Sequence, residues 1–181
     1  YAQGLAAAGY TVRKELNLGD EKTAMRALEE GVIDGYPEYT GTALLSLCGV
    51  PTHEIPNDPE RAFEEARGCF ARDGLTAFPP TPFTSSNEVG VTQATADTYD
   101  LAKISDLAKV DQDFTLYGSP ECRQRTDCLL GLRETYGLRF KRFVPVAIDL
   151  RHQVLERGED VASIVFTTDP QNTREGIVLL E

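Results

Sequence analysis

The sequence predicts an α/β protein with mainly parallel sheets, and three observations support this prediction. Segments with helical and with strand-like patterns alternate along the 181 residues, which favours helices layered on parallel sheets over a bundle or a sandwich. The hydrophobic content of 41% is sufficient for a core of ordinary size. Residues 77–86 contain three prolines followed by a polar cluster, so the alternation stops there and the chain is expected to cross between two parts.

In the first part of the chain, start and stop signals mark the helices. Asp20 is a suitable N-terminal cap for a helix that runs through Glu30 and ends at Gly31. Asp58 caps a later helix, and Pro59 occupies its first turn, where the missing N–H costs nothing. The expected elements are the end of an alanine-rich helix at 1–9, a strand at 11–16, a helix at 20–30, a strand at 32–34, a helix at 43–48 and the helix that begins at Asp58.

The second part continues the alternation. Gly137 and Gly158 are stop signals for two of its helices, and Ser105 is placed to cap a short one. Residues 167–170, Thr-Thr-Asp-Pro, end a strand and provide a second crossing. The expected elements are strands at 89–92, 114–117, 140–146, 162–166 and 176–180, and helices at 92–99, after Ser105, up to Gly137 and at 149–157.

The two crossings describe a second lobe inserted into a first one. In this interpretation residues 1–83 form the first lobe, residues 84–166 form the inserted lobe and residues 167–181 return to the first lobe. Each lobe is expected to hold a mainly parallel sheet flanked by helices. A single α/β domain with a long proline-rich loop explains the same pattern, and the order of elements leaves both open.

The charge of the chain excludes one class of partner. A formal net charge of -11 and a pI near 4.7 repel a phosphate backbone, and no cluster of Lys and Arg has the density of a nucleic-acid footprint. We therefore expect no binding to nucleic acid.

The longest apolar runs fall far short of the roughly 20 residues that span a bilayer.

Four cysteines, at positions 48, 69, 122 and 128, favour disulfides over a metal site. They lack the spacing of zinc ligands, and only His53 and His152 could add imidazole. Cys122 and Cys128 would close a short loop if they faced each other, which suits an oxidising compartment. Four buried free thiols are the alternative, and the pairing of Cys48 and Cys69 stays open.

The motif at residues 34–42, Asp-Gly-Tyr-Pro-Glu-Tyr-Thr-Gly-Thr, is the most specific in the chain. It resembles the signature of the substrate-binding proteins of osmoprotectant ABC importers, of the glycine betaine, choline and carnitine type. In that family a buried strand ends in a tyrosine that is followed by Thr-Gly-Thr at a helix start. Similar segments follow in the family's order at residues 17–19, 103–107, 125–127, 131–132, 136–137 and 166–169.

The resemblance implies a two-lobed periplasmic-binding fold of type II with a ligand in the cleft between the lobes. It also implies an extracytoplasmic protein, with a lipid anchor as one option, that delivers its ligand to the permease subunits of an ABC importer. We expect a monomer with no cofactor, no metal and no catalytic residues. The family's pattern further implies that parts of the first lobe lie beyond both ends of the sequence.

The ligand class explains the residues that the family uses. A quaternary ammonium has no N–H, so aromatic rings surround it, and a carboxylate on the same ligand needs an arginine or backbone amides. By resemblance Tyr39 matches the cage tyrosine of the first lobe, and Thr40 and Thr42 offer hydroxyls to the ligand carboxylate. Arg125 matches the arginine that binds the carboxylate. A core tyrosine and a solvated arginine are the competing interpretations.

Three positions depart from the family's pattern. Asn87 stands where many relatives have a tyrosine, His152 occupies another tyrosine position, and Phe166 keeps a ring without the hydroxyl. Together with Thr167 they complete the candidate ligand-binding set. A site with Asn87 and His152 in its wall could hydrogen-bond its ligand, which a fully methylated ammonium would not exploit.

Two alternatives follow from these departures. One keeps the fold and the transport role with a different polar ligand. The other is a thiol enzyme or redox sensor that uses Cys122 or Cys128, although neither cysteine has a histidine nearby in sequence and no CxxC motif is present.

Overall fold

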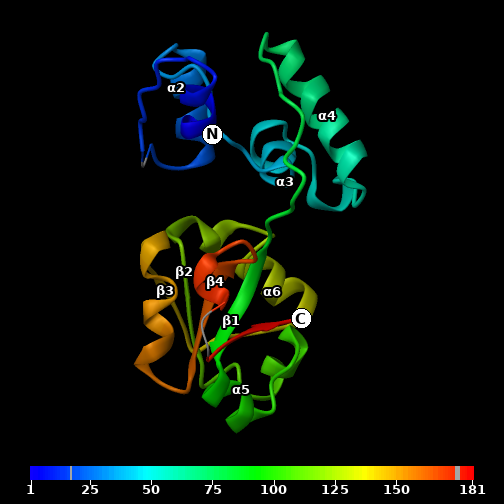
Figure 1. Ribbon diagram of the computed structural model, residues 1–181. Coiled ribbons are helices and arrows are strands. Elements are labelled where there is room, and N and C mark those ends of the chain that lie inside the picture. Colours follow the sequence, from blue (N-terminus) through cyan, green and yellow to red (C-terminus); the bar gives the residue numbers. More distant parts are fainter. Residues whose placement is uncertain (17, 174–175) are drawn as a thin grey trace. The chain divides into compact units, whose positions relative to one another are not determined.

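The computed structural model describes residues 1–16, 18–173 and 176–181, and the chain divides into two compact units. Unit 1 is Tyr1–Pro80 and unit 2 is Thr81–Glu181 (Figure 1). The α/β class is confirmed, since helices occur in both units and a sheet is present in unit 2. Within the described residues, no helix combines the length and the apolar character that a membrane span needs.

The described part of unit 1 consists of helices and turns. Two caps form as expected: the Asp20 carboxylate accepts from the backbone N of Thr23 at 2.9 Å, and Asp58 accepts from that of Arg61 at 2.8 Å. Gly31 adopts a φ of +72° directly after the first of these helices. The elements are α1 (Ala2–Ala7), α2 (Glu21–Glu29), α3 (Thr40–Thr42), η1 (Ala43–Leu47), η2 (Thr52–Glu54) and α4 (Pro59–Arg72).

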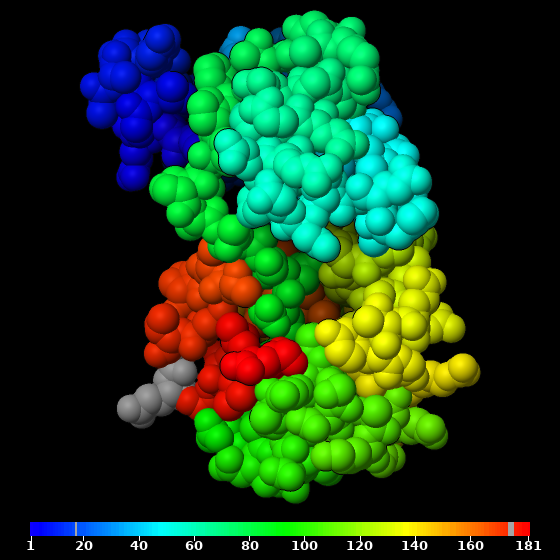
Figure 2. Space-filling model, turned by 90° about the vertical axis from the view of Figure 1, so that its right-hand side faces the viewer, coloured from blue at the N-terminus to red at the C-terminus, as the bar shows by residue number. Residues whose placement is uncertain are grey.

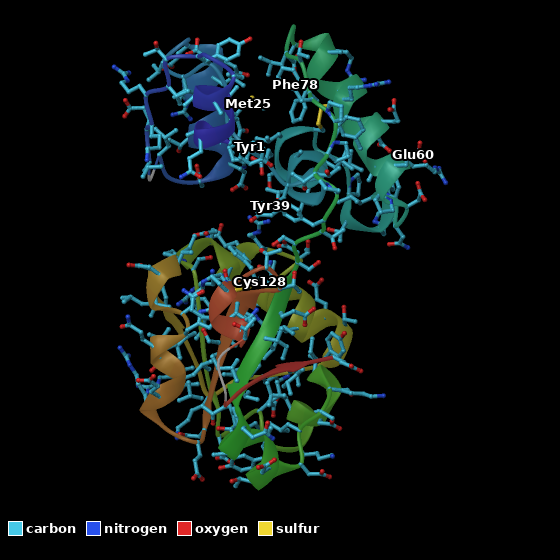
Figure 3. The ribbon with its side chains drawn as sticks, in the orientation of Figure 1. Tyr1, Met25, Tyr39, Glu60, Phe78 and Cys128 are labelled. Carbon is cyan, nitrogen blue, oxygen red and sulfur yellow. A yellow bond between two sulfur atoms is a disulfide. The ribbon has the colours of Figure 1, made fainter. Side chains whose placement is uncertain are left out.

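A small core and a disulfide join α4 to η1, a short π-helix. Leu44 of η1 is fully buried, and it packs with Ala62 and Ala66 on one face of α4. The Cys48–Cys69 disulfide links the end of η1 to the same helix, with the Cα atoms 6.2 Å apart. Its sulfur–sulfur bond is drawn in yellow beside α4 in Figure 3. This core is small, so the covalent link adds to the constraint on η1 and α4.

The two strands expected in the first part do not form. Residues 11–16 form no regular element, and residues 32–34 lie in bends after α2. A strand exists only through hydrogen bonds to a neighbouring strand, and the described residues of unit 1 hold no such partner. The predicted sheet of a first lobe is therefore absent from the described part of this unit. The matching segment that begins at Asn17 falls partly outside the described residues, because Asn17 itself is not among them.

Unit 2 contains a five-stranded mixed sheet with the order β3-β2-β4-β1-β5. β2 is parallel to β3 and to β4, whereas β1 is antiparallel to both β4 and β5. Four strands therefore share one direction, and β1 is the strand that reverses. The strands are β1 (Asn87–Thr92), β2 (Thr115–Gly118), β3 (Arg142–Pro145), β4 (Val161–Phe166) and β5 (Ile177–Leu180).

Both faces of this sheet are covered. On one face Leu116, Ala162 and Ile164 belong to the main core, which includes Leu107 and Leu132 from the helical segments. On the other face the core contains Tyr117, Val154, Leu155 and Val161. The helical elements are α5 (Gln93–Tyr99), η3 (Ile104–Lys109), η4 (Pro120–Gln124), α6 (Leu129–Tyr136), η5 (Ile148–Leu150), η6 (Gln153–Arg157) and η7 (Pro170–Thr173). The central strand β4 is buried on both sides, which explains its continuous apolar run.

Two local expectations for unit 2 need correction. Residues 149–157 form two short 3₁₀ turns, η5 and η6, rather than one helix. The short helix η3 is capped by Asp106, whose carboxylate accepts from the backbone N atoms of Ala102 and Lys103, and not by Ser105. The other expected strands and helices of this part are present within a few residues of the predicted bounds.

The division of the chain lies close to the first predicted crossing. The boundary between Pro80 and Thr81 falls inside the proline-rich stretch, three residues before the predicted limit at 83. At the other end, β5 pairs in register with β1, for example Leu180 with Val89, so residues 177–180 belong to the sheet of unit 2. The lobe assignments 1–83, 84–166 and 167–181 stay predictions.

Candidate ligand-binding site

Several candidate residues meet at one edge of the unit 2 sheet. Because β1 runs antiparallel to β4, Asn87 at the start of β1 is paired in register with Phe166 at the end of β4. β2 runs parallel to β4 and ends at Gly118, where the chain turns into η4. In α/β sheets, ligands bind outside the carboxyl ends of the strands. Asn87, Arg125, Phe166 and Thr167 are grouped at this edge, which Figure 1 shows at the start of β1.

Asp127 holds the guanidinium of Arg125 in a bidentate ion pair. Nε of Arg125 donates to Oδ1 of Asp127 at 2.8 Å, and Nη2 donates to Oδ2 at 2.7 Å. Nδ2 of Asn87 donates to the backbone oxygen of Asp127 at 2.9 Å and to its Oδ2 at 3.3 Å. The Arg125 side chain is 21% exposed and that of Asp127 is 44% exposed. The ion pair is therefore at the surface. Asn87, the first residue of β1, connects the pair to the sheet through its hydrogen bonds to Asp127.

A disulfide closes the loop that carries Arg125. Cys122 and Cys128 are bonded, with their Cα atoms 5.2 Å apart, and both are buried. Gly131 of α6 lies so close to this loop that a Cβ at its position would come within 2.0 Å of the Thr126 carbonyl oxygen. The loop is thus anchored to the core on one side and to α6 on the other. Arg125 is presented from a constrained backbone, and Figure 3 labels Cys128 at this end of the unit.

The Phe166 ring is stacked against a cation that belongs to the protein. The guanidinium carbon of Arg151 is 3.9 Å from the ring centroid, and Arg151 is only 3% exposed. Arg151 also donates from Nη2 to Oδ2 of Asp169 at 3.1 Å and from Nε to the carbonyl of Ile148 at 2.8 Å. A cation–π contact of this kind uses one face of the ring. That face of Phe166 is consequently occupied by Arg151.

His152 takes part in the same internal network. It is 9% exposed, and its Nε2 lies 2.8 Å from Oδ1 of Asn172 and 4.0 Å from Oδ2 of Asp169. Nδ2 of Asn172 donates to the carbonyl of Phe166 at 2.8 Å. Since an amide oxygen only accepts, Nε2 of His152 is the donor in the bond to Asn172. His152 therefore connects the η5–η6 segment to the turn after β4.

The two predicted crossings are joined by hydrogen bonds within unit 2. The backbone N of Ser86 donates to Oγ1 of Thr167 at 3.0 Å, and the backbone N of Thr167 donates to the carbonyl of Ser86 at 3.0 Å. The hydroxyls of Ser85 and Thr168 are 2.8 Å apart. Thr167 is exposed, and its hydroxyl oxygen is an acceptor in this ladder.

The remaining candidates belong to unit 1. Tyr39 immediately precedes α3 and is 49% exposed (Figure 3), with its backbone N donating to Oε1 of Glu38 at 2.7 Å. Thr40, the first residue of α3, is half-buried, whereas Thr42 is buried. Tyr39 is the aromatic residue of this motif with an exposed ring. As ligand contacts, all three positions stay predictions.

Two residues of the network were not among the sequence candidates. Arg151 and Asn172 have no local signal, because their partners Asp169 and His152 stand 18 and 20 residues away in the chain. An arginine within a predicted helix is usually solvated, and only the fold reveals the burial of Arg151. His152, predicted in the wall of the ligand site, is bonded to Asn172, and its role as a ligand contact stays a prediction.

Two acidic or phenolic groups near the candidate residues have shifted pKa values. Burial raises the pKa of Glu88, which follows Asn87 in β1. Burial, together with the nearby Glu38 carboxylate, raises the pKa of Tyr36 in the motif at residues 34–42. Both groups therefore favour their protonated forms more than the same groups in water.

Two surface hollows of unit 2 have none of the candidate residues in their lining. One of about 370 Å³ is lined by Leu130, Arg133, Glu134 and Arg139. Another of about 570 Å³ lies between α5 and β5, where green and red atoms meet in Figure 2, and it is open to solvent. Within the described residues, no group of three or more His, Cys, Asp or Glu side chains is placed to hold a metal ion.

Known proteins resemble the chain in sequence and in fold. A carnitine transport binding protein, OpuCC, of Listeria monocytogenes is 27% identical over 168 residues, covering 91% of this chain and 54% of that protein. An ergothioneine transport permease/ergothioneine binding protein, EgtU, of Helicobacter pylori is 29% identical over 146 residues, covering 80% of this chain and 26% of that protein. The chain thus spans about half the length of the first relative and about a quarter of the second.

A solved structure described as a glycine betaine/carnitine/choline ABC transporter superposes with a TM-score of 0.64 at 25% identity, covering 90% of this chain and 60% of that one. The family model described as the substrate binding domain of ABC-type glycine betaine transport systems matches residues 1–181. This match extends over the whole sequence and agrees with the fold of the solved structure. The chain therefore belongs to the family of substrate-binding domains of ABC-type glycine betaine transport systems.

Proposed function

We propose that this chain is part of the binding component of an ABC importer, and that it binds a small zwitterion such as glycine betaine or carnitine. The observation that carries the proposal is the Arg125 guanidinium, fixed by its disulfide-closed loop at the edge where the candidate residues gather. A planar guanidinium matches the geometry of a carboxylate. Arg125 is the proposed partner of the ligand carboxylate.

Aromatic rings are the proposed contacts of the ligand's ammonium group. Tyr39 offers an exposed ring, and Phe166 offers a partly buried ring with one face stacked on Arg151. Cation–π attraction to such rings is worth about 0.5–2 kcal/mol per contact. Asn87 supplies no ring at its position, and the imidazole of His152 is buried and hydrogen-bonded to Asn172. Thr40, Thr42 and Thr167 supply hydroxyls. The cage is consequently smaller than the family's pattern implies.

A second candidate ligand has a polar or heteroaromatic part beside the charged groups. The observation in its favour is Asn87, an amide placed at the edge between β1 and β4 where a ring was expected. One relative is named for ergothioneine binding, which adds that compound to the ligands worth testing. The fold and the transport role are the same for both candidates.

The proposed location is outside the cytoplasm, with the permease subunits of an importer as partners. All four cysteines form disulfides, Cys48–Cys69 and Cys122–Cys128, and such bonds persist in oxidising compartments. The same pairing argues against a thiol enzyme, because a nucleophilic thiolate needs a free cysteine. The proposed protein is a monomer without catalytic activity.

A ligand panel on the full-length protein tests this function. Thermal shift followed by calorimetry compares glycine betaine, carnitine, choline, proline betaine, ergothioneine and unmethylated amino acids. We expect at least one methylated ammonium compound to raise the melting temperature, and Tyr39→Ala to reduce the shift. Stabilisation by unmethylated amino acids alone would contradict the aromatic cage, and no stabilisation by any compound would contradict the function.

A further inference from the structure

Asp127 opposes the charge of the residue that the proposed function assigns to the ligand carboxylate. Its two carboxylate oxygens accept from Nε and Nη2 of Arg125 at 2.8 and 2.7 Å. An ion pair of this geometry has no net charge, so Arg125 does not act as an isolated cation towards a ligand. The Asp127 side chain is 44% exposed, which leaves it in reach of a bound molecule.

Asn87 adds a second constraint on the same carboxylate. Its amide donates to Oδ2 of Asp127 at 3.3 Å and to the backbone oxygen at 2.9 Å. Oδ2 therefore accepts from Arg125 and from Asn87. Asn87, which stands where the family has a cage tyrosine, thus orients the Asp127 carboxylate. A carboxylate attracts an ammonium group as a ring does, and with greater strength where water is partly excluded.

We infer that Asp127 is a specificity-determining residue, which sets the preference between ligands that carry a carboxylate and ligands that do not. This inference rests on the proposed function, in which Arg125 contacts the ligand. For a cation without a carboxylate, such as choline, Asp127 is attractive. For a zwitterion such as glycine betaine, Asp127 offsets part of the attraction that Arg125 exerts on the ligand carboxylate. Asp127 therefore shifts selectivity towards choline.

The test measures both dissociation constants by calorimetry in the full-length protein. Asp127→Asn removes the charge at nearly constant shape, and we expect the ratio of the choline constant to the glycine betaine constant to rise about tenfold. Asp127→Glu keeps the charge, so the ratio should stay close to that of the unmodified protein. Asp113→Asn is the matched control, since it removes an exposed carboxylate at the other end of β2. It should leave the ratio unchanged.

The ratio separates a charge effect from structural damage. A variant that only loosens the Arg125 loop weakens glycine betaine more than choline, because only glycine betaine has a carboxylate for Arg125. The ratio would then fall instead of rising, which would overturn the inference while the proposed function stands. An unchanged ratio in Asp127→Asn would overturn it as well. If the unmodified protein binds neither ligand, the proposed function fails and the inference fails with it.

Discussion

Arg151 is the residue whose environment differs most from that of an ordinary surface arginine. It is 3% exposed, it pairs with Asp169, and it stacks on the Phe166 ring. A buried charge is tolerated only when it is paired and hydrogen-bonded, and removing one partner leaves the other uncompensated. The network therefore holds the η5–η6 segment against the end of β4, next to the proposed ligand site.

We predict that Arg151→Met destabilises the protein by about 3 kcal/mol, since it leaves the Asp169 carboxylate without its arginine partner and with the Phe166 backbone N as a remaining donor. Urea unfolding followed by circular dichroism measures this loss. The double variant Arg151→Met with Asp169→Asn should lose less than the two single variants together. Arg157→Met is the control, because Arg157 is exposed and lies 5.4 Å above the Tyr117 ring. A loss in Arg157→Met as large as that in Arg151→Met would contradict the prediction.

Glu88 gives a prediction about pH. Burial raises its pKa in the folded state above the unfolded value, so the folded state binds the proton more tightly. The stability that this proton contributes is present at low pH and is lost as the pH rises through the folded-state pKa. We expect Glu88→Gln to raise the melting temperature at pH 7 and to change it little near about pH 3.5, where the carboxyl is protonated in both states. An equal shift at both pH values would show that ionisation is not the cause.

At the scale of single elements, the Arg125 loop and α4 each depend on one disulfide. Cys48–Cys69 spans 21 residues and Cys122–Cys128 spans only 6. The stabilisation by loop closure grows with the length of the loop, to about 3 kcal/mol for the longer one and about 2 kcal/mol for the shorter one. The shorter loop is the one that carries the proposed ligand arginine.

The two disulfides are therefore predicted to rank in opposite order for stability and for binding. Replacing Cys48 and Cys69 by alanine should cost more in urea unfolding, whereas replacing Cys122 and Cys128 should cost more in glycine betaine affinity. The two double variants serve as controls for each other. Equal losses of affinity would mean that the Arg125 loop needs no disulfide to hold its shape.

The sequence predicted those elements whose signals are local. Asp58 with Pro59 gave the start of α4, and the apolar runs of unit 2 gave its strands within a few residues. The 11–16 and 32–34 segments failed because strand formation depends on a partner elsewhere in the chain. The η5–η6 segment failed because Arg151 and His152 turn inwards to residues 18 and 20 positions away. Motif similarity selected Arg125 as a candidate, but the bonds of Asp127 to Arg125 and to Asn87 required the fold.

At the scale of the whole molecule, the chain consists of two units with separate cores. The main core of unit 2 is built on the sheet, and that of unit 1 on η1 and α4. The connecting stretch has no helix or strand between Arg72 and Asn87. Phe78 and Phe83 in this stretch are 81% and 60% exposed. Exposed backbone of this kind is the preferred site of proteolysis.

Limited digestion by chymotrypsin should therefore cut first after Phe83. Phe78 is followed by proline, which blocks cleavage at that bond. We expect a C-terminal fragment that begins at Thr84, identified by mass spectrometry, and slow digestion of Phe83→Ser under the same conditions. Early cleavage inside the strands of unit 2 would contradict the division into these two units.

The central claim is that this family member binds a small zwitterion through Arg125. Equilibrium dialysis of radiolabelled glycine betaine against the full-length protein tests it most directly. The variants compared are Arg125→Gln and, as the control, Arg133→Gln, which removes one positive charge from an exposed position and so leaves both variants with the same net charge. We predict saturable binding that falls at least about tenfold in Arg125→Gln, as expected for a lost charged hydrogen bond, and is unchanged in Arg133→Gln. Equal binding by the two variants, or no saturable binding by the unmodified protein, would contradict the claim.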